Sequence, residues 1–164
     1  MTIRELEPGT NRKDLETVVP AYLEFWNHPE SLEYLSLTGR PFEEKQVRVW
    51  CAAHCTDGIR YFGAFSQAEA LEGLLLTKQN PVEGFGLFSL GVRHECKRKG
   101  LGRRLVRHAV DVARHDTYRS VDVHVYAENA AMLCLVLNEG FVPVRMDHRR
   151  GPSGQDLVHL RRYL

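Results

Sequence analysis

The chain has 164 residues, a formal net charge of +1 at pH 7, and 43% hydrophobic residues. This length and composition predict one folded domain over residues 1–164 with a substantial core. A net charge so close to zero argues against general binding to nucleic acids or anionic membranes. No apolar run approaches the roughly 20 residues of a membrane span. The first residues lack the apolar stretch of a signal peptide, so we expect a cytoplasmic protein.

The four cysteines form no CxxC pair and no cluster with histidine at zinc-binding spacing. We therefore expect reduced thiols and no metal.

The N-terminal third begins with a strand-like alternation over residues 3–7. Apolar residues at helical spacing then predict a helix over residues 14–26, which Pro20 should bend or divide. A shorter helix is expected over residues 30–37, and a third over residues 42–54.

Three antiparallel strands are predicted next, over residues 59–66, 70–78 and 84–92, with turn residues between them. A helix with one apolar face starts near Gly100 and reaches about Ala113.

The last part of the chain begins with strict alternation over residues 121–126, which places Asp122, His124 and Tyr126 on one face. A helix over residues 129–138 and a hairpin of residues 141–150 and 155–163 complete the chain. The fold class is α+β, with a central mixed, mostly antiparallel sheet of six to seven strands flanked by helices. The unpaired edge of the hairpin is the surface on which we expect a homodimer, if one forms.

An apolar strand, residues 87–92, leads into a basic turn, residues 93–102, and then into a helix. The first backbone N–H groups of such a helix have no helical acceptor and lie at the positive end of its dipole, so they favour a phosphate. Gly100 and Gly102 allow the close backbone approach that a diphosphate needs. Neither the P-loop pattern GxxxxGK[ST] nor the dinucleotide pattern GxGxxG occurs here. The surrounding basic residues are Lys97, Arg98, Lys99, Arg103 and Arg104.

Residues 92–102 resemble the acyl-CoA-binding signature of the GNAT family of N-acetyltransferases, Arg/Gln-x-x-Gly-x-Gly/Ala, with Lys97 at the Arg/Gln position. Residues 129–141 are similar to the Asn-to-Gly-Phe helix of the same family, at matching spacing. The resemblance covers the chain from about Phe85 onward. It implies the acyl-CoA N-acyltransferase fold, with acetyl-CoA as the acyl donor.

The same resemblance implies which residues hold acetyl-CoA. The backbone of Leu90 and Val92, at a bulge in the strand, would bind the pantetheine arm, and Gly91 fits either a bulge or a packing requirement. Asn129 would help to hold the arm, or would serve only as a helix N-cap. The expected coenzyme-binding residues are Leu90, Val92, Lys97, Arg98, Lys99, Gly100, Leu101, Gly102, Arg103 and Asn129.

The expected reaction is transfer of the acetyl group to a primary amine of a small molecule or peptide, by direct attack in a ternary complex. The general base is Glu83, near the start of the fourth strand, or else His124 or Asp122 on the fifth. The tyrosine that serves as proton donor in many members is replaced by Val136, and Tyr126 and Cys134 are the candidates to substitute for it.

The loss of that tyrosine also supports an alternative, a non-catalytic acyl-CoA-binding or sensing domain. The acceptor itself cannot be identified from the sequence. Aromatic residues of the N-terminal helices either line an acceptor pocket or, more commonly, form core: these are Phe25, Trp26, Tyr34 and Phe42. Acidic residues there would attract a cationic amine: these are Glu30, Glu33, Glu43 and Glu44.

Overall fold

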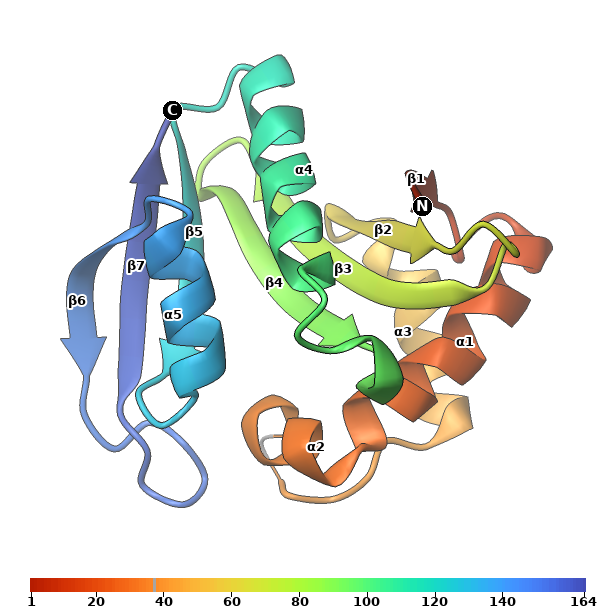
Figure 1. Cartoon of the computed structure of the whole chain (residues 1–164), viewed down its shortest axis with the longest axis horizontal. Coiled ribbons are helices and arrows are strands. Elements are labelled where there is room, and N and C mark those ends of the chain that lie inside the picture. Colours follow the sequence, from red (N-terminus) through yellow and green to blue (C-terminus); the bar gives the residue numbers. More distant parts are fainter. Residues whose placement is uncertain (37) are drawn as a thin grey trace.

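The computed structural model describes residues 1–36 and 38–164, and is built around a seven-stranded sheet (Figure 1). The strand order is β1-β2-β3-β4-β5-β7-β6, and every neighbouring pair is antiparallel except β4 with β5. The mixed, mostly antiparallel sheet predicted from the sequence is therefore confirmed. The strands are β1 (Thr2–Leu6), β2 (Ile59–Phe65), β3 (Leu71–Asn80), β4 (Gly84–Val92), β5 (Ser120–Tyr126), β6 (Val142–Asp147) and β7 (Leu157–Tyr163).

Helices flank both faces of the sheet and lie close to the predicted ranges. Helix α1 continues past Pro20, so the proline does not divide it, and buried residues such as Val18 and Trp26 anchor both halves on the sheet. Leu37, the last residue of the predicted second helix, lies outside the described residues. The helices are α1 (Arg12–Asn27), α2 (Pro29–Leu35), α3 (Glu44–His54), α4 (Leu101–His115) and α5 (Ala130–Asn138), with a 3-10 turn η1 (His94–Cys96) before α4.

Two apolar clusters hold the helices on the sheet. Helices α4 and α5 pack on one face, where Leu105 and Val136 meet Val123 of β5. Helices α1 and α3 pack on the other face, with Trp26 against the β2–β3 half of the sheet. Among the described residues, this second cluster contains no residue of β5, β6 or β7. The corresponding face of these three strands therefore lies outside this cluster.

Strands β4 and β5 separate along their length. Their register runs only from Phe85 opposite Val121 to Leu87 opposite Val123. Beyond these residues the two strands diverge, and the V-shaped opening between them faces α2 (Figure 1). Backbone groups on the open edges of both strands are thus available to a ligand.

The β4 bulge lies at Phe88, and not between Leu90 and Val92, where the family resemblance implied it. Leu76 of β3 pairs with Ser89 and Thr77 with Leu87, so Phe88 is the extra residue, whereas Gly91 pairs regularly with Leu74. The reason for glycine at position 91 is packing, because the indole of Trp26 occupies the space where a β-carbon would be.

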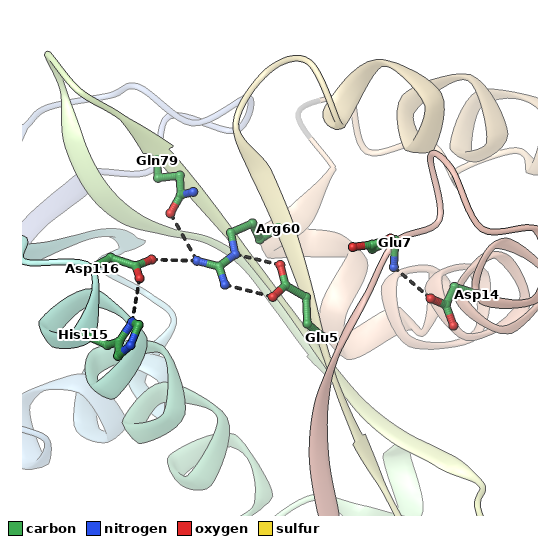
Figure 2. A network of polar contacts seen from close by, with 7 residues as sticks. All are labelled: Glu5, Glu7, Asp14, Arg60, Gln79, His115 and Asp116. Carbon is green, nitrogen blue, oxygen red and sulfur yellow. Dashed lines mark hydrogen bonds and ion pairs between the residues drawn. The ribbon is translucent and has the colours of Figure 1, made fainter.

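A polar network centred on Arg60 fixes the far end of the sheet (Figure 2). The Arg60 guanidinium of β2 donates to both carboxylate oxygens of Glu5 on β1, at 2.7 and 2.8 Å, and to Asp116 at 2.8 Å. Asp116 ends α4, so the network holds the end of α4 that lies opposite the basic turn.

None of the helices in the described part of the chain combines the length and apolar character needed to cross a lipid bilayer.

Candidate active site

A cavity of about 1040 Å³ occupies the opening between β4 and β5. Its walls come from β4, β5, α2, the turn before α4, and α5. The structure therefore brings together residues that the sequence analysis took from two separate motifs. Of the predicted coenzyme-binding residues, Lys99 is exposed and outside the lining. The predicted residues that line the cavity are Leu90, Val92, Lys97, Arg98, Gly100, Leu101, Gly102, Arg103, His124, Tyr126 and Asn129.

The turn before α4 has the backbone conformation of an anion-binding site. Arg98 and Gly100 both have left-handed backbone angles, with φ of 62° and 80°, on either side of Lys99. Among the described residues, no group accepts a hydrogen bond from the backbone amides of residues 98–103. Successive amides in such a turn form a concave nest, and the dipole of α4 adds positive potential. This geometry suits a diphosphate.

The basic side chains around the turn differ in their availability. Within the described part of the chain, Arg98 makes no ion pair. The Lys97 ammonium lies 3.0 Å from the Glu30 carboxylate on α2, and this hydrogen bond lowers the pKa of Glu30. The Arg103 guanidinium lies 3.1 Å from Glu139, a buried carboxylate at the end of α5. Lys97 and Arg103 therefore already have protein partners.

Gly102 and Asn129 connect the turn to α5. A β-carbon on Gly102 would lie 3.1 Å from Cδ1 of Leu135 and 3.6 Å from Cδ2 of Leu90, so the first turn of α4 fits closely between α5 and β4. The Oδ1 atom of Asn129 accepts a hydrogen bond from the Met132 amide at 3.1 Å, which caps α5. Asn129 also lines the cavity. A contact of its side chain with a coenzyme, in addition to its role as the cap of α5, stays a prediction.

His124 lies at the point where β4 and β5 separate. It follows Val123, the last β5 residue paired with β4. A second cavity, of about 410 Å³, meets the first at Leu87, Phe88, Val123 and His124. His124 is the titratable residue at this junction. Its surroundings lower the pKa of the ring, first by partial exclusion of water and then through the charge of His159. The imidazole is therefore held in its neutral, proton-accepting form near pH 7.

The other two base candidates lie away from the main cavity. Glu83 is exposed in the turn before β4, at the opposite end of that strand from Leu90, and its carboxylate is 3.9 Å from the Lys78 ammonium. Asp122 receives two hydrogen bonds from Arg161, at 2.6 and 3.0 Å. Both residues line the second cavity only. His124 is the base candidate that the structure places in the same cavity as the basic turn.

The position of the family tyrosine faces the core in this chain. Val136 has 0% exposure, packs within the α4–α5 cluster, and does not line the cavity. The side chain at this position therefore belongs to the core of this structure. Tyr126 and Cys134, the two candidates to replace the missing donor, both line the cavity.

The N-terminal aromatic residues are mainly core. Phe25 and Trp26 are each 1% exposed, and Phe42 packs against the same cluster. Tyr34 on α2 differs, because it lines the cavity and its hydroxyl lies 3.5 Å from the Glu128 carbonyl oxygen across the opening. Helix α2 thus reaches the start of α5 and covers the open end of the V.

Three carboxylates line the cavity on the side of α2, namely Glu30, Glu33 and Glu128. Glu43 and Glu44 have other roles, because Glu43 begins α3 through a capping box and Glu44 pairs with Arg48.

The sequence analysis did not identify His159 or Asp147. The His159 Nε2 atom lies 2.8 Å from Asp147 Oδ2, and His159 pairs with His124 across β5 and β7. Alternation in residues 157–163 indicates that His159 and Arg161 share a face. Their partners depend on the strand register, which no local pattern provides.

A group that could hold a metal lies near the cavity mouth. The ligand atoms of His28, Glu30 and His94 lie within 4.8 Å of one another. The two imidazoles are stacked at 4.2 Å, and the Glu30 carboxylate is already bonded to Lys97. The sequence expectation of no metal stays a prediction.

Comparisons with known proteins agree with this architecture. No curated protein sequence matches the chain. Among solved structures, ribosomal-protein-alanine N-acetyltransferase from Brucella melitensis is 20% identical over 100% of both chains, with a TM-score of 0.76. A point mutant of spermidine N-acetyltransferase from Vibrio cholerae is 20% identical, over 99% of this chain and 95% of that chain, with a TM-score of 0.77. The ribosomal-protein-S18-alanine N-acetyltransferase from Escherichia coli is 21% identical, over 99% of this chain and 92% of that chain, with a TM-score of 0.72.

At these identities, the structural likeness shows the fold alone. The sequence model of the acetyltransferase (GNAT) family, however, matches residues 19–136, which is well over half of the chain. The match includes β4, the basic turn, α4, β5 and most of α5. The protein therefore belongs to the GNAT acetyltransferase family.

Proposed function

We propose that this protein transfers an acetyl group from acetyl-CoA to a primary amine of a small molecule or peptide, by direct attack in a ternary complex. The observation that carries this proposal is the shared cavity, in which the unpaired amides of residues 98–103 and the neutral imidazole of His124 line one space. An anion-binding turn and a proton acceptor in one cavity match the needs of a diphosphate-bearing acyl donor and an amine.

The turn before α4 binds the diphosphate through its backbone amides, with Arg98 as the available cation. From there the acyl arm runs into the opening between the strands. The edge of β4 beyond Leu87 has no β5 partner, so backbone groups near Leu90 and Val92 are available to the amide groups of the arm. This places the thioester near the junction at His124.

His124 accepts the proton that the amine must lose. Alkyl amines titrate near ~10.4 and are mostly charged at neutral pH, so a neutral imidazole is needed to expose the nitrogen lone pair. The amine nitrogen forms the new bond to the carbonyl carbon and releases its remaining excess proton to solvent, the carbon–sulfur bond breaks, and the coenzyme leaves as a thiolate. Tyr126 gives its phenolic proton to that thiolate and regains one from solvent. The products are the amide and the coenzyme thiol.

The acceptor side of the cavity favours a cationic amine. Within the described residues, the Glu33 and Glu128 carboxylates form no ion pair, whereas Glu30 is neutralised by Lys97. These two negative charges attract a positively charged substrate, while the basic turn attracts the anionic coenzyme.

One observation favours a second function, a non-catalytic acyl-CoA-binding or sensing domain. Val136 cannot donate a proton and faces the core, so the position that carries the acid in many relatives is lost here. General acid catalysis contributes about 10²–10⁴-fold, so this loss predicts a slower enzyme before an inactive one.

The decisive experiment measures thiol release from acetyl-CoA with a panel of neutral amines, diamines, polyamines and peptides. We expect acetyl-CoA-dependent release with at least one cationic amine, and a large loss of turnover in His124→Gln with little change in coenzyme affinity by calorimetry. Binding without turnover on any amine would support the sensing domain. Absence of coenzyme binding would overturn both functions.

A further inference from the structure

His124 is packed against a second histidine on the open face of the sheet. His124 of β5 and His159 of β7 are direct partners in the antiparallel ladder. Their ring centroids are 4.1 Å apart and their planes are inclined by 58°. Directly opposed residues of an antiparallel pair project to the same face, so this contact follows from the register.

The His159 ring is held in one orientation from its other side. Its Nε2 atom lies 2.8 Å from Asp147 Oδ2 on β6, and its side chain is only 14% exposed. Arg145 donates to the same carboxylate oxygen at 2.8 Å. These two contacts, with Arg145 first, lower the pKa of Asp147, so the carboxylate is charged and holds a proton on His159 Nε2.

We propose that His159, oriented by Asp147, is a positioning residue that fixes the His124 ring at the junction of the two cavities and disfavours a positive charge on it. The inference rests on the proposed function, in which His124 is the general base. It adds to the candidate site Asp147 of β6 and His159 of β7, which do not line the main cavity.

The charges around His124 support this role. Asp122 forms an ion pair with Arg161, and Asp147 forms one with Arg145. These ion pairs limit how strongly the two carboxylates can favour the protonated form of His124. After partial burial, His159 makes the largest contribution to the lowered pKa of His124. When His159 carries a positive charge, that charge disfavours a second one on the adjacent His124 ring. The groups that face His124 are Asp122 and Tyr126 of β5, His159 and Arg161 of β7, Arg145 and Asp147 of β6, and Lys78 and Glu83 across the second cavity.

The first test is an NMR titration of the His124 Cε1–H resonance, assigned by its loss in His124→Gln. The variants are His159→Phe, which keeps an aromatic ring against His124, and His159→Gln, which removes it. We expect the pKa of His124 to rise by about 1 unit in both variants, because neither phenylalanine nor glutamine can place a positive charge beside the ring. The matched control is His148→Gln in the β6–β7 turn, where His148 pairs with Asp156 at 3.2 Å. This control should leave the His124 titration unchanged.

The second test is the pH profile of kcat/KM with a reactive amine. Because the free enzyme must have His124 neutral, the acidic limb should move to higher pH in His159→Phe by the same amount as the NMR pKa. On the high-pH plateau His159→Phe should keep most of its kcat, whereas His159→Gln should lose kcat because the His124 ring is no longer held. Thermal unfolding of each variant confirms that it is folded.

The outcomes separate this inference from the proposed function. An unchanged His124 pKa in both folded His159 variants would overturn the inference, whatever the activity. A shifted NMR pKa with an unmoved acidic limb would overturn it as well, because His124 would then not be the base that His159 serves. A shifted NMR pKa in a protein that acetylates no amine would support the contact between the rings and overturn the proposed function alone.

Discussion

The indole of Trp26 occupies the space in front of Gly91. A β-carbon on Gly91 would lie 2.8 Å from both Cε3 and Cη2 of that ring, which is closer than real β-carbons approach other atoms. The indole nitrogen of Trp26 also donates to the Ser89 hydroxyl at 2.8 Å. Helix α1 thus holds β4 in place along the stretch where β4 no longer pairs with β5.

This contact predicts that Gly91→Ala destabilises the protein. The added methyl group must displace the indole or the strand, and overpacking of this kind costs about 1–3 kcal/mol. The measurement is the free energy of unfolding in urea. Gly86→Ala on the same strand is the matched control, because its β-carbon would meet nothing closer than 3.6 Å. Equal stability of the two variants would show that the indole moves aside easily.

Gly102→Val should weaken acetyl-CoA binding by more than about tenfold, which corresponds to 1.4 kcal/mol. The valine side chain would enter the narrow space between Leu135 and Leu90, beside the unpaired amides of the turn. Arg98→Ala should cost less, because it leaves those amides in place. Calorimetry with both variants measures the difference. If Gly102→Val binds coenzyme like the parent protein, the diphosphate does not bind at this turn.

Asn129→Ser separates two roles of one side chain. Serine caps helices about as well as asparagine, so the stability of α5 should change little. Its shorter side chain should not reach a coenzyme arm in the cavity, so acetyl-CoA affinity should fall. Affinity and unfolding midpoint are measured on the same sample. Unchanged affinity would leave the Met132 cap as the whole function of Asn129.

The sequence predicted the elements well because their signals are local. The turn residues beside β4 helped to give its bounds, residues 84–92, and the apolar stripe of α4 gave its position within a few residues. The basic turn was also identifiable, because its residues are contiguous. The position of the β4 bulge was not identifiable from the sequence. It depends on the register between β3 and β4 and on how Trp26 packs against Gly91.

The orientation of single side chains was the other feature that the sequence did not predict. Val136 and Cys134 lie on one short helix that is apolar on most sides, so the sequence did not reveal which of them faces the core. The contact between His124 and His159 required the β5–β7 register. Contacts of this kind join separate strands, and the pairing of strands is not local information.

Val136→Tyr should not restore a proton donor. Because Val136 is fully buried, a tyrosine ring there overpacks the α4–α5 cluster and should lower the free energy of unfolding by about 1–3 kcal/mol or more. Turnover should not rise. Val136→Phe should behave in the same way, because its ring has nearly the same volume. Faster turnover in the tyrosine variant alone would mean that α5 rotates to bring this position into the cavity.

Tyr126→Phe tests the donor that remains in the cavity. Tyr126 follows His124 by two residues on β5, so the two side chains share a face and both border the main cavity. If the phenol protonates the departing thiolate, its loss should lower kcat by at least about tenfold, toward the general-acid range of 10²–10⁴. The acetyl-CoA dissociation constant should stay nearly unchanged, because the ring itself is kept.

Tyr34→Phe is the matched control, because it removes a hydroxyl from the same cavity at α2, where that hydroxyl lies 3.5 Å from the Glu128 carbonyl. If Tyr126→Phe and Tyr34→Phe both turn over like the parent protein, the thiolate leaves unassisted or with a proton from Cys134, and Cys134→Ala then distinguishes these two routes.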